Sequence, residues 1–126
     1  MRVLDRVGKF TNIRQVRNVI WVKSAHKTTK RFPLEVQQRI ADTLEIVANG
    51  TTPDAVRPMK GLASGIFEIR IAYRTNAYRA VYALNLAKAI YVLHSFQKKS
   101  TQGIATPKKE IETIKSRLKM LKDRLT

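Results

Sequence analysis

Three strand-like segments follow one another between residues 66 and 96, and they constrain the fold of this chain more than any other feature. Their sequences are IFEIRIAY, AYRAVYAL and AIYVLHSF. All three are rich in β-branched and aromatic residues, which strands favour. The intervening segments RTNA and NLAK are short enough to be hairpin connections. The pattern therefore predicts an antiparallel meander of three strands.

Helical periodicity is found on both sides of the meander. A first helix is predicted after Pro33 and ends at Asn49-Gly50; its apolar face is Val36, Ile40, Leu44 and Val47. A last helix is predicted after Thr106 and Pro107, as N-cap and first helical residue. Its apolar stripe is Ile111, Ile114, Leu118, Leu121 and Leu125. VIWVK (19–23) is expected to be a strand, VRPMKGL (56–62) to be extended, and 24–32 to be a loop or a short helix.

These elements predict an α+β fold, with a twisted antiparallel sheet, helices packed mainly on one face, and a C-terminal helix. The second face of the sheet is expected to be a shallow concave surface that basic side chains could line. We expect one domain at residues 19–126, preceded by a basic and partly disordered extension at residues 1–18. No apolar segment is long enough to cross a bilayer, and the N-terminus lacks a signal-peptide core. The sequence therefore predicts a cytoplasmic protein without a membrane partner.

Positive charge is the strongest feature of the composition. The chain has 25 Lys and Arg against 9 Asp and Glu, a formal net charge of +16. A small domain with this imbalance attracts polyanions. The charge predicts nucleic acid or the ribosome as a partner.

Several kinds of chemistry have no residues to support them. Without cysteine, disulfides, cysteine zinc sites and thiol catalysis are excluded. The acids lie mostly outside the meander, and the two histidines have no metal-ligand spacing. No glycine-rich phosphate loop is present. We therefore expect neither a metal nor a cofactor.

A ribonuclease that uses no metal requires only side chains that transfer protons and side chains that carry positive charge. It directs the RNA 2′-hydroxyl against the neighbouring phosphate with a proton acceptor, a proton donor and cations. Histidine can fill either proton role near neutrality. The candidate side chains on or beside the meander are Arg70, Arg74, Arg79, Lys98 and Lys99, with His94 and the tyrosines Tyr73, Tyr78 and Tyr82.

A structural role for His94 competes with this hypothesis. Counting alternate residues along the strand places His94 on one face with Ile90 and Val92. It could then be a hydrogen-bonded core histidine, and Lys98 and Lys99 an ordinary solvated strand end. Composition alone predicts only a basic α+β domain that binds nucleic acid.

Three segments in order resemble the RelE/HigB toxin superfamily, in its phage-derived HigB-like branch. They are MKGLASGIFEIRI, YRAVY and YVLHSFQKKSTQGIATPKKEIE, and the resemblance extends from about residue 19 to residue 121. It implies a RelE-like fold and a toxin of a type II toxin–antitoxin system. Such toxins are typically endoribonucleases that cut mRNA on the ribosome. The implied partners are mRNA, the ribosome and an antitoxin of the helix-turn-helix type.

The resemblance also implies site residues. YRAVY corresponds to the family's YRLVY strand and places its phosphate-holding arginine at Arg79. FEIRI corresponds to YKIKL and places a basic site residue at Arg70, while the paired basic residues after the last strand fall on Lys98 and Lys99. We assign catalysis to His94, Arg79 and Arg70, and RNA binding to Lys98, Lys99, Arg74 and Lys60.

Two departures from the family pattern bear on the catalytic roles. Glu68 stands where RelE has a lysine that is its proposed catalytic base, and no counterpart of the C-terminal catalytic tyrosine is evident. His94 could take over proton transfer, as histidine does in HigB-like members. The rival hypotheses are a ParE-like toxin, which inhibits gyrase without cutting RNA, and a non-toxic nucleic-acid-binding phage relic.

Overall fold

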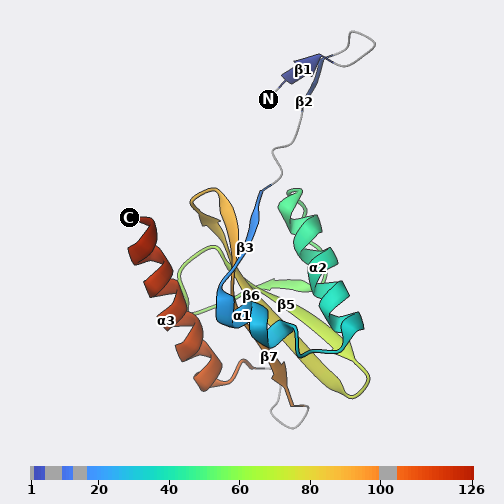
Figure 1. The fold of residues 1–126 in the computed structure, drawn as a ribbon, viewed down its shortest axis with the longest axis vertical. Coiled ribbons are helices and arrows are strands. Elements are labelled where there is room, and N and C mark those ends of the chain that lie inside the picture. Colours follow the sequence, from blue (N-terminus) through green and yellow to red (C-terminus); the bar gives the residue numbers. More distant parts are fainter. Residues whose placement is uncertain (1, 5–9, 13–16, 100–104) are drawn as a thin grey trace.

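The computed structural model describes residues 2–4, 10–12, 17–99 and 105–126 (Figure 1). Its strands are β1 (Arg2–Leu4), β2 (Phe10–Asn12), β3 (Val19–Trp21), β4 (Val56–Pro58), β5 (Ile66–Tyr73), β6 (Asn76–Leu86) and β7 (Ala89–Lys98). Its helices are α1 (Lys23–Thr29), α2 (Leu34–Ala48) and α3 (Lys108–Leu125). Most of the predicted N-terminal extension lies outside the described residues, and the domain boundary at residue 18 stays a prediction.

A five-stranded sheet in the order β3-β7-β6-β5-β4 forms the centre of the molecule. The predicted meander is confirmed, because β5, β6 and β7 pair antiparallel in sequence order. Each connection is a two-residue turn, and in the second one Ala87 and Lys88 both have positive φ, as a type I′ turn requires. The edge strand β3 pairs parallel to β7, which the sequence did not reveal. Strands β1 and β2 form a separate antiparallel pair.

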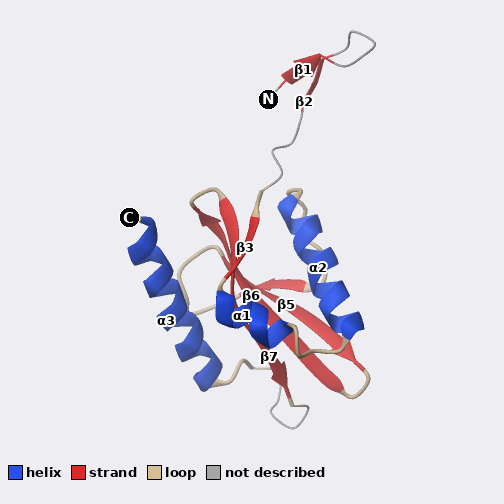
Figure 2. Ribbon diagram, in the orientation of Figure 1, coloured by secondary structure: helices blue, strands red, loops and turns tan. Residues whose placement is uncertain are grey.

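The helices cover both faces of this sheet (Figure 2). The predicted apolar face of α2, including Val36 and Ile40, packs with Ala25 of α1 on one face. On the other face, Ile114 and Leu118 of α3 pack against apolar residues of β6 and β7. The predicted α+β class is confirmed. The expected open second face is wrong, because α3 buries its apolar stripe there.

Both long helices begin one residue later than the sequence patterns indicated. Pro33 and Pro107 are the N-cap residues of α2 and α3, with extended ψ angles of 144° and 145°. The prediction that Thr106 caps the last helix is therefore wrong. Its hydroxyl is used elsewhere, as described below. At the other end of α2, Asn49 and Gly50 end the helix as predicted, with Gly50 at a φ of 92°.

None of the helices in the described part of the chain is both long and apolar enough to span a membrane.

Candidate functional site

A β-bulge in β7 sets the direction of His94. Val81 lies opposite His94, but the next residue of β6 lies opposite Val92, so Leu93 is an extra residue in β7. This extra residue shifts the alternation of side chains by one position. His94 therefore points toward α3, as Leu93 does, whereas Val92 belongs to the core beneath α1 and α2.

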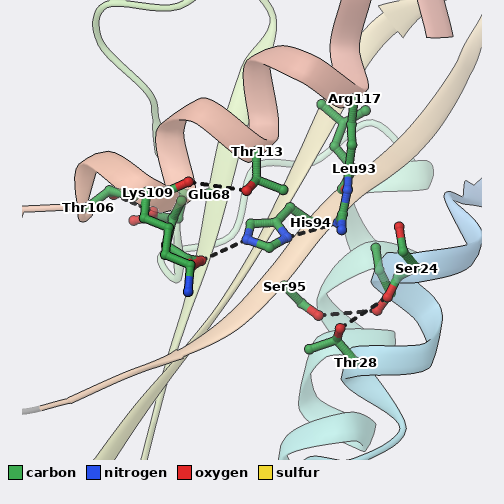
Figure 3. A network of polar contacts seen from close by, with 12 residues as sticks. Ser24, Thr28, Glu68, Leu93, His94, Ser95, Thr106, Lys109, Thr113 and Arg117 are labelled. Carbon is green, nitrogen blue, oxygen red and sulfur yellow. Dashed lines mark hydrogen bonds and ion pairs between the residues drawn. The ribbon is translucent and has the colours of Figure 1, made fainter. Parts of the chain in front are cut away.

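The neighbouring Ser95 confirms this shift. Its hydroxyl lies 2.7 Å from that of Thr29 and donates a hydrogen bond to the Ala25 carbonyl, both in α1. Figure 3 shows the His94 ring and the Ser95 hydroxyl on opposite sides of the strand. The interpretation that places His94 on the face of Ile90 and Val92 is therefore wrong, because it counts alternate residues through a bulge.

Three rows of residues cross β5, β6 and β7 on the face that α3 covers. They are Glu68, Val81 and His94; Arg70, Arg79 and Phe96; and Ala72, Ala77 and Lys98. Adjacent rows are two residues apart along each strand and so share a face. The sheet thereby brings four of the predicted site residues together: Arg70, Arg79, His94 and Lys98.

A carboxylate stands between the two arginines of this surface. Glu68 is 1% exposed, and its Oε1 lies 2.8 Å from Nε of Arg70 and 3.3 Å from Nη1 of Arg79. The hydroxyl of Thr106 donates to Oε2 of Glu68 at 2.9 Å (Figure 3). The same hydroxyl accepts a hydrogen bond from Nη1 of Arg79 at 3.3 Å. Burial lowers the pKa of Arg79, and the charge of Glu68 opposes that effect. Both arginines are held in place by these bonds.

Lys98 adds a further cation to the same face. It is 2% exposed, and among the described residues its Nζ has no hydrogen-bond partner. Burial lowers the pKa of Lys98, and the charge of Arg79 lowers it further, while Glu68 acts in the opposite direction. Lys98 thus adds a third positive charge to the face on which Arg70 and Arg79 pair with Glu68. A buried ammonium without a partner is costly unless an anion joins it.

His94 belongs to a second group of polar side chains, contributed by α3. Its Nδ1 lies 2.9 Å from Nη1 of Arg117, and its Nε2 lies 2.7 Å from Oε2 of Glu110. Because arginine can only donate, Nδ1 must be the acceptor. The proton of the neutral ring is then on Nε2, where it is donated to Glu110. The ring also stacks on Phe96, with centroids 5.4 Å apart.

This arrangement favours a neutral imidazole. Burial lowers the pKa of His94; the bond to Glu110 raises it and the charge of Arg117 lowers it. Arg117 also donates to the carbonyl of Leu93, so it joins α3 to the bulge. In this geometry Nδ1 of His94 is an unprotonated nitrogen next to the positive charge of Arg117. The carboxylate of Glu110 orients the ring through the opposite nitrogen, Nε2.

The remaining predicted residues lie apart from this surface. Lys99 is exposed at the end of β7. Arg74 is in the β5–β6 turn over the ring of Tyr73, and Lys60 precedes the other end of β5. Tyr73, Tyr78 and Tyr82 pack in the core on the α1–α2 side, so the inventory of site tyrosines is wrong. Burial raises the pKa of Tyr82 to about 12.

The predicted site did not include Thr106, Glu110 or Arg117; Thr106 was expected only as a helix cap. In α3, Glu110 and Arg117 lie four residues before and three residues after the buried Ile114. Polar residues at such spacing share the buried face of a helix. That pattern could have identified them. Among the described residues, no group of three or more potential metal ligands is found.

The lowered pKa of His94 predicts how stability depends on pH. The unfolded chain binds the proton more tightly than the folded one, so acidification favours unfolding. This contribution is complete above about pH 6.5 and is lost as the pH falls through the folded-state pKa. Between about pH 7.5 and pH 5, the melting temperature of the wild type should therefore fall further than that of His94→Gln. His26→Gln, at an exposed position, is the control and should behave as wild type. Equal losses in His94→Gln and wild type would contradict the prediction.

Comparison with solved structures identifies proteins of the same fold. An arginine double mutant of the E. coli toxin RelE, in its free state, matches 83% of this chain and 97% of its own with a TM-score of 0.57 and 16% identity. The isolated E. coli RelE toxin matches 79% of this chain and 97% of its own with a TM-score of 0.54 and 16% identity. No curated protein matches the sequence.

The fold is therefore RelE-like, as the resemblance implied. Residues 15–119 match the family described as Phage derived protein Gp49-like (DUF891). The chain belongs to this phage-derived Gp49-like family.

Proposed function

We propose that this chain is the toxin of a type II toxin–antitoxin pair, and that it cleaves translated mRNA in the cytoplasm without a metal ion. The single observation that carries the proposal is the buried ammonium of Lys98. It lies on the same face as Arg70 and Arg79, and among the described residues it has no hydrogen-bond partner. An RNA phosphate has the charge that such a site requires. The RelE-like fold and the family membership support the same assignment.

In the proposed mechanism, the cations act on the phosphate. Arg79 and Arg70 stabilise the charge that develops there as the 2′-oxygen attacks and the bond to the 5′-oxygen breaks. Glu68 keeps the two guanidinium groups in position before RNA arrives. Lys98 contacts the phosphate, and Lys99, Arg74 and Lys60 contact the RNA chain farther away.

In this proposal His94 accepts the proton of the 2′-hydroxyl on Nδ1, and solvent water protonates the departing 5′-oxygen. The Nδ1 lone pair becomes accessible when the bound phosphate draws Arg117 away, since a guanidinium pairs more strongly with phosphate than with a neutral imidazole. Glu110 meanwhile holds the ring through Nε2. The phosphate thus has two effects in this mechanism: it binds to the cations of the site, and by drawing Arg117 away it exposes Nδ1 of His94.

Expression without a neutralising partner tests the proposed function. Growth should stop within minutes, and primer extension should map new cuts in translated transcripts.

Lys98→Met, which keeps the length of the side chain and removes its charge, should lower the affinity for RNA about tenfold or more. Lys88→Met, in an exposed turn, is the control.

Each rival function predicts a different result. Growth arrest without transcript cleavage would support gyrase inhibition of the ParE type. Soluble, folded protein without growth arrest would exclude a toxin. Unchanged RNA affinity of the Lys98→Met variant would contradict the assignment of this surface as the phosphate site.

A further inference from the structure

An apolar groove lies beside the C-terminal turns of α3 and begins about one helical turn after Arg117 of the polar site. Its volume is about 650 Å³. Its apolar lining comes from the β3–α1 junction, from β7 and from α3, and consists of Ile20, Trp21, Val22, Tyr91, Met120 and Leu121. Figure 1 shows α3 to the left of β3 and α1, with its C-terminal end at the opposite end of the helix from the end of β7.

Two large apolar side chains in this groove are exposed to solvent. Ile20 is 42% exposed on the edge strand β3, and Met120 is 55% exposed on α3. They are brought together from positions far apart in the sequence. Exposed apolar side chains that gather in one hollow, rather than being scattered singly, mark an interaction surface.

The rim of the groove is positively charged. Lys23, Lys27 and Arg124 line it, and none of the described lining residues is acidic. A complementary ligand has an apolar stripe flanked by carboxylates. An amphipathic helix carries such a stripe on one face and can place acidic residues on both sides of it.

We propose that this groove binds an acidic amphipathic helix of the protein that neutralises the chain. This inference rests on the proposed function, which supplies the partner. The apolar stripe of that helix packs on Met120 and Ile20, and its carboxylates pair with Lys27 and Arg124. The groove residues Met120 and Leu121 follow Arg117 by three and four residues along α3, and no lining residue of the groove belongs to the polar site. The helix therefore anchors the partner beside the polar site without occupying it.

Charge argues against two other occupants. A second copy of this chain would bring its own net charge of +16 against a basic rim. Nucleic acid would match the rim, but its charged backbone offers no aliphatic stripe for Ile20 and Met120. Both are distinguishable by experiment.

Met120→Asp tests the proposal, with Leu34→Asp as its matched control. Both changes put a carboxylate at an exposed apolar position of a helix, and Leu34 is 82% exposed on α2, outside the groove. The partner is selected from a genomic library of the source organism as the clone that restores growth, and is then purified. Both variants should arrest growth as wild type does. Met120→Asp should bind the purified partner at least about tenfold more weakly, whereas Leu34→Asp should be unchanged.

A charge reversal gives a second readout. Lys27→Glu should also weaken the complex, and the affinity of the wild type should fall as salt is added, because the rim contacts are screened. Equal affinity of Met120→Asp and wild type, or equal weakening by Leu34→Asp, would overturn the proposal. So would self-association of the wild type that Met120→Asp abolishes, or a loss of RNA affinity in that variant.

The two proposals fail in different ways. If the wild type does not arrest growth, the proposed function fails. If it does arrest growth and the Met120→Asp protein is still neutralised and bound normally, only the groove assignment fails. If no genomic clone restores growth, the proposal that a protein of the same organism neutralises the chain fails.

Discussion

Replacing Arg79 with alanine should abolish growth arrest and reduce RNA cleavage roughly 10²–10³-fold, the usual cost of losing a group that stabilises developing charge. Arg79 lies opposite Arg70 on the neighbouring strand, and its guanidinium group is fixed by Glu68 and Thr106. Glu68 would still be paired with Arg70 and Thr106, so no buried carboxylate would be left alone. Cleavage of a defined transcript by purified protein, below its melting temperature, measures the loss.

Two further variants separate charge from shape at this position. Arg79→Gln keeps much of the side chain and should be as inactive as Arg79→Ala. Arg31→Ala removes an arginine from the exposed connection between α1 and α2 and should retain full activity. Full growth arrest by a folded Arg79→Ala protein would contradict the assignment of Arg79 to the reaction.

Removal of His94 should have a comparable effect for a different reason. His94→Ala eliminates the proposed proton-transfer group, a change that costs ~10²–10⁴ in rate. Ser95→Ala is a stringent control because Ser95 is the next residue in the strand and is also buried, but it points to α1. Ser95→Ala should lower the melting temperature and retain cleavage. His94→Ala should lose cleavage while still folded.

The opposite result would identify His94 as a structural residue. If His94→Ala melts earlier than wild type but cleaves at the normal rate below its melting temperature, the ring only joins α3 to the sheet. Glu110→Gln refines this test, because it alters the orientation and the basicity of the ring while leaving the imidazole in place. It should shift the pH profile of cleavage if His94 transfers a proton.

Local periodicity was sufficient to predict the main elements of the fold. The helical stripe that includes Val36 and Ile40 and the three strand segments depend only on neighbouring residues, and all were confirmed. The parallel pairing of β3 with β7 was not predictable in this way. It joins residues that are distant in the sequence, and the short strand carries no signal that distinguishes a parallel from an antiparallel partner.

The candidate site was predicted less completely, for two physical reasons. The bulge at Leu93 depends on the register between two strands, so counting alternate residues placed His94 on the wrong face. The packing of α3 on the second face brings Glu110 and Arg117 to His94. Their spacing around Ile114 indicates that they lie on the buried face of the helix, but it does not indicate which residue of the sheet they contact. The basic residues Arg70, Arg79 and Lys98 were assigned from the family resemblance, and the pairing of the meander strands places them on one face.

The parallel pairing of β3 also has a consequence for the order of folding. Val19 pairs with Ile90, a separation of 90 − 19 = 71 residues, whereas the meander strands are joined by two-residue turns. Closing a long loop costs more entropy than closing a hairpin, and contacts between distant residues form more slowly. We expect the meander to form first and β3 to add last. The three-residue edge strand would then also be the first part of the sheet to open, and its opening would expose the outer edge of β7.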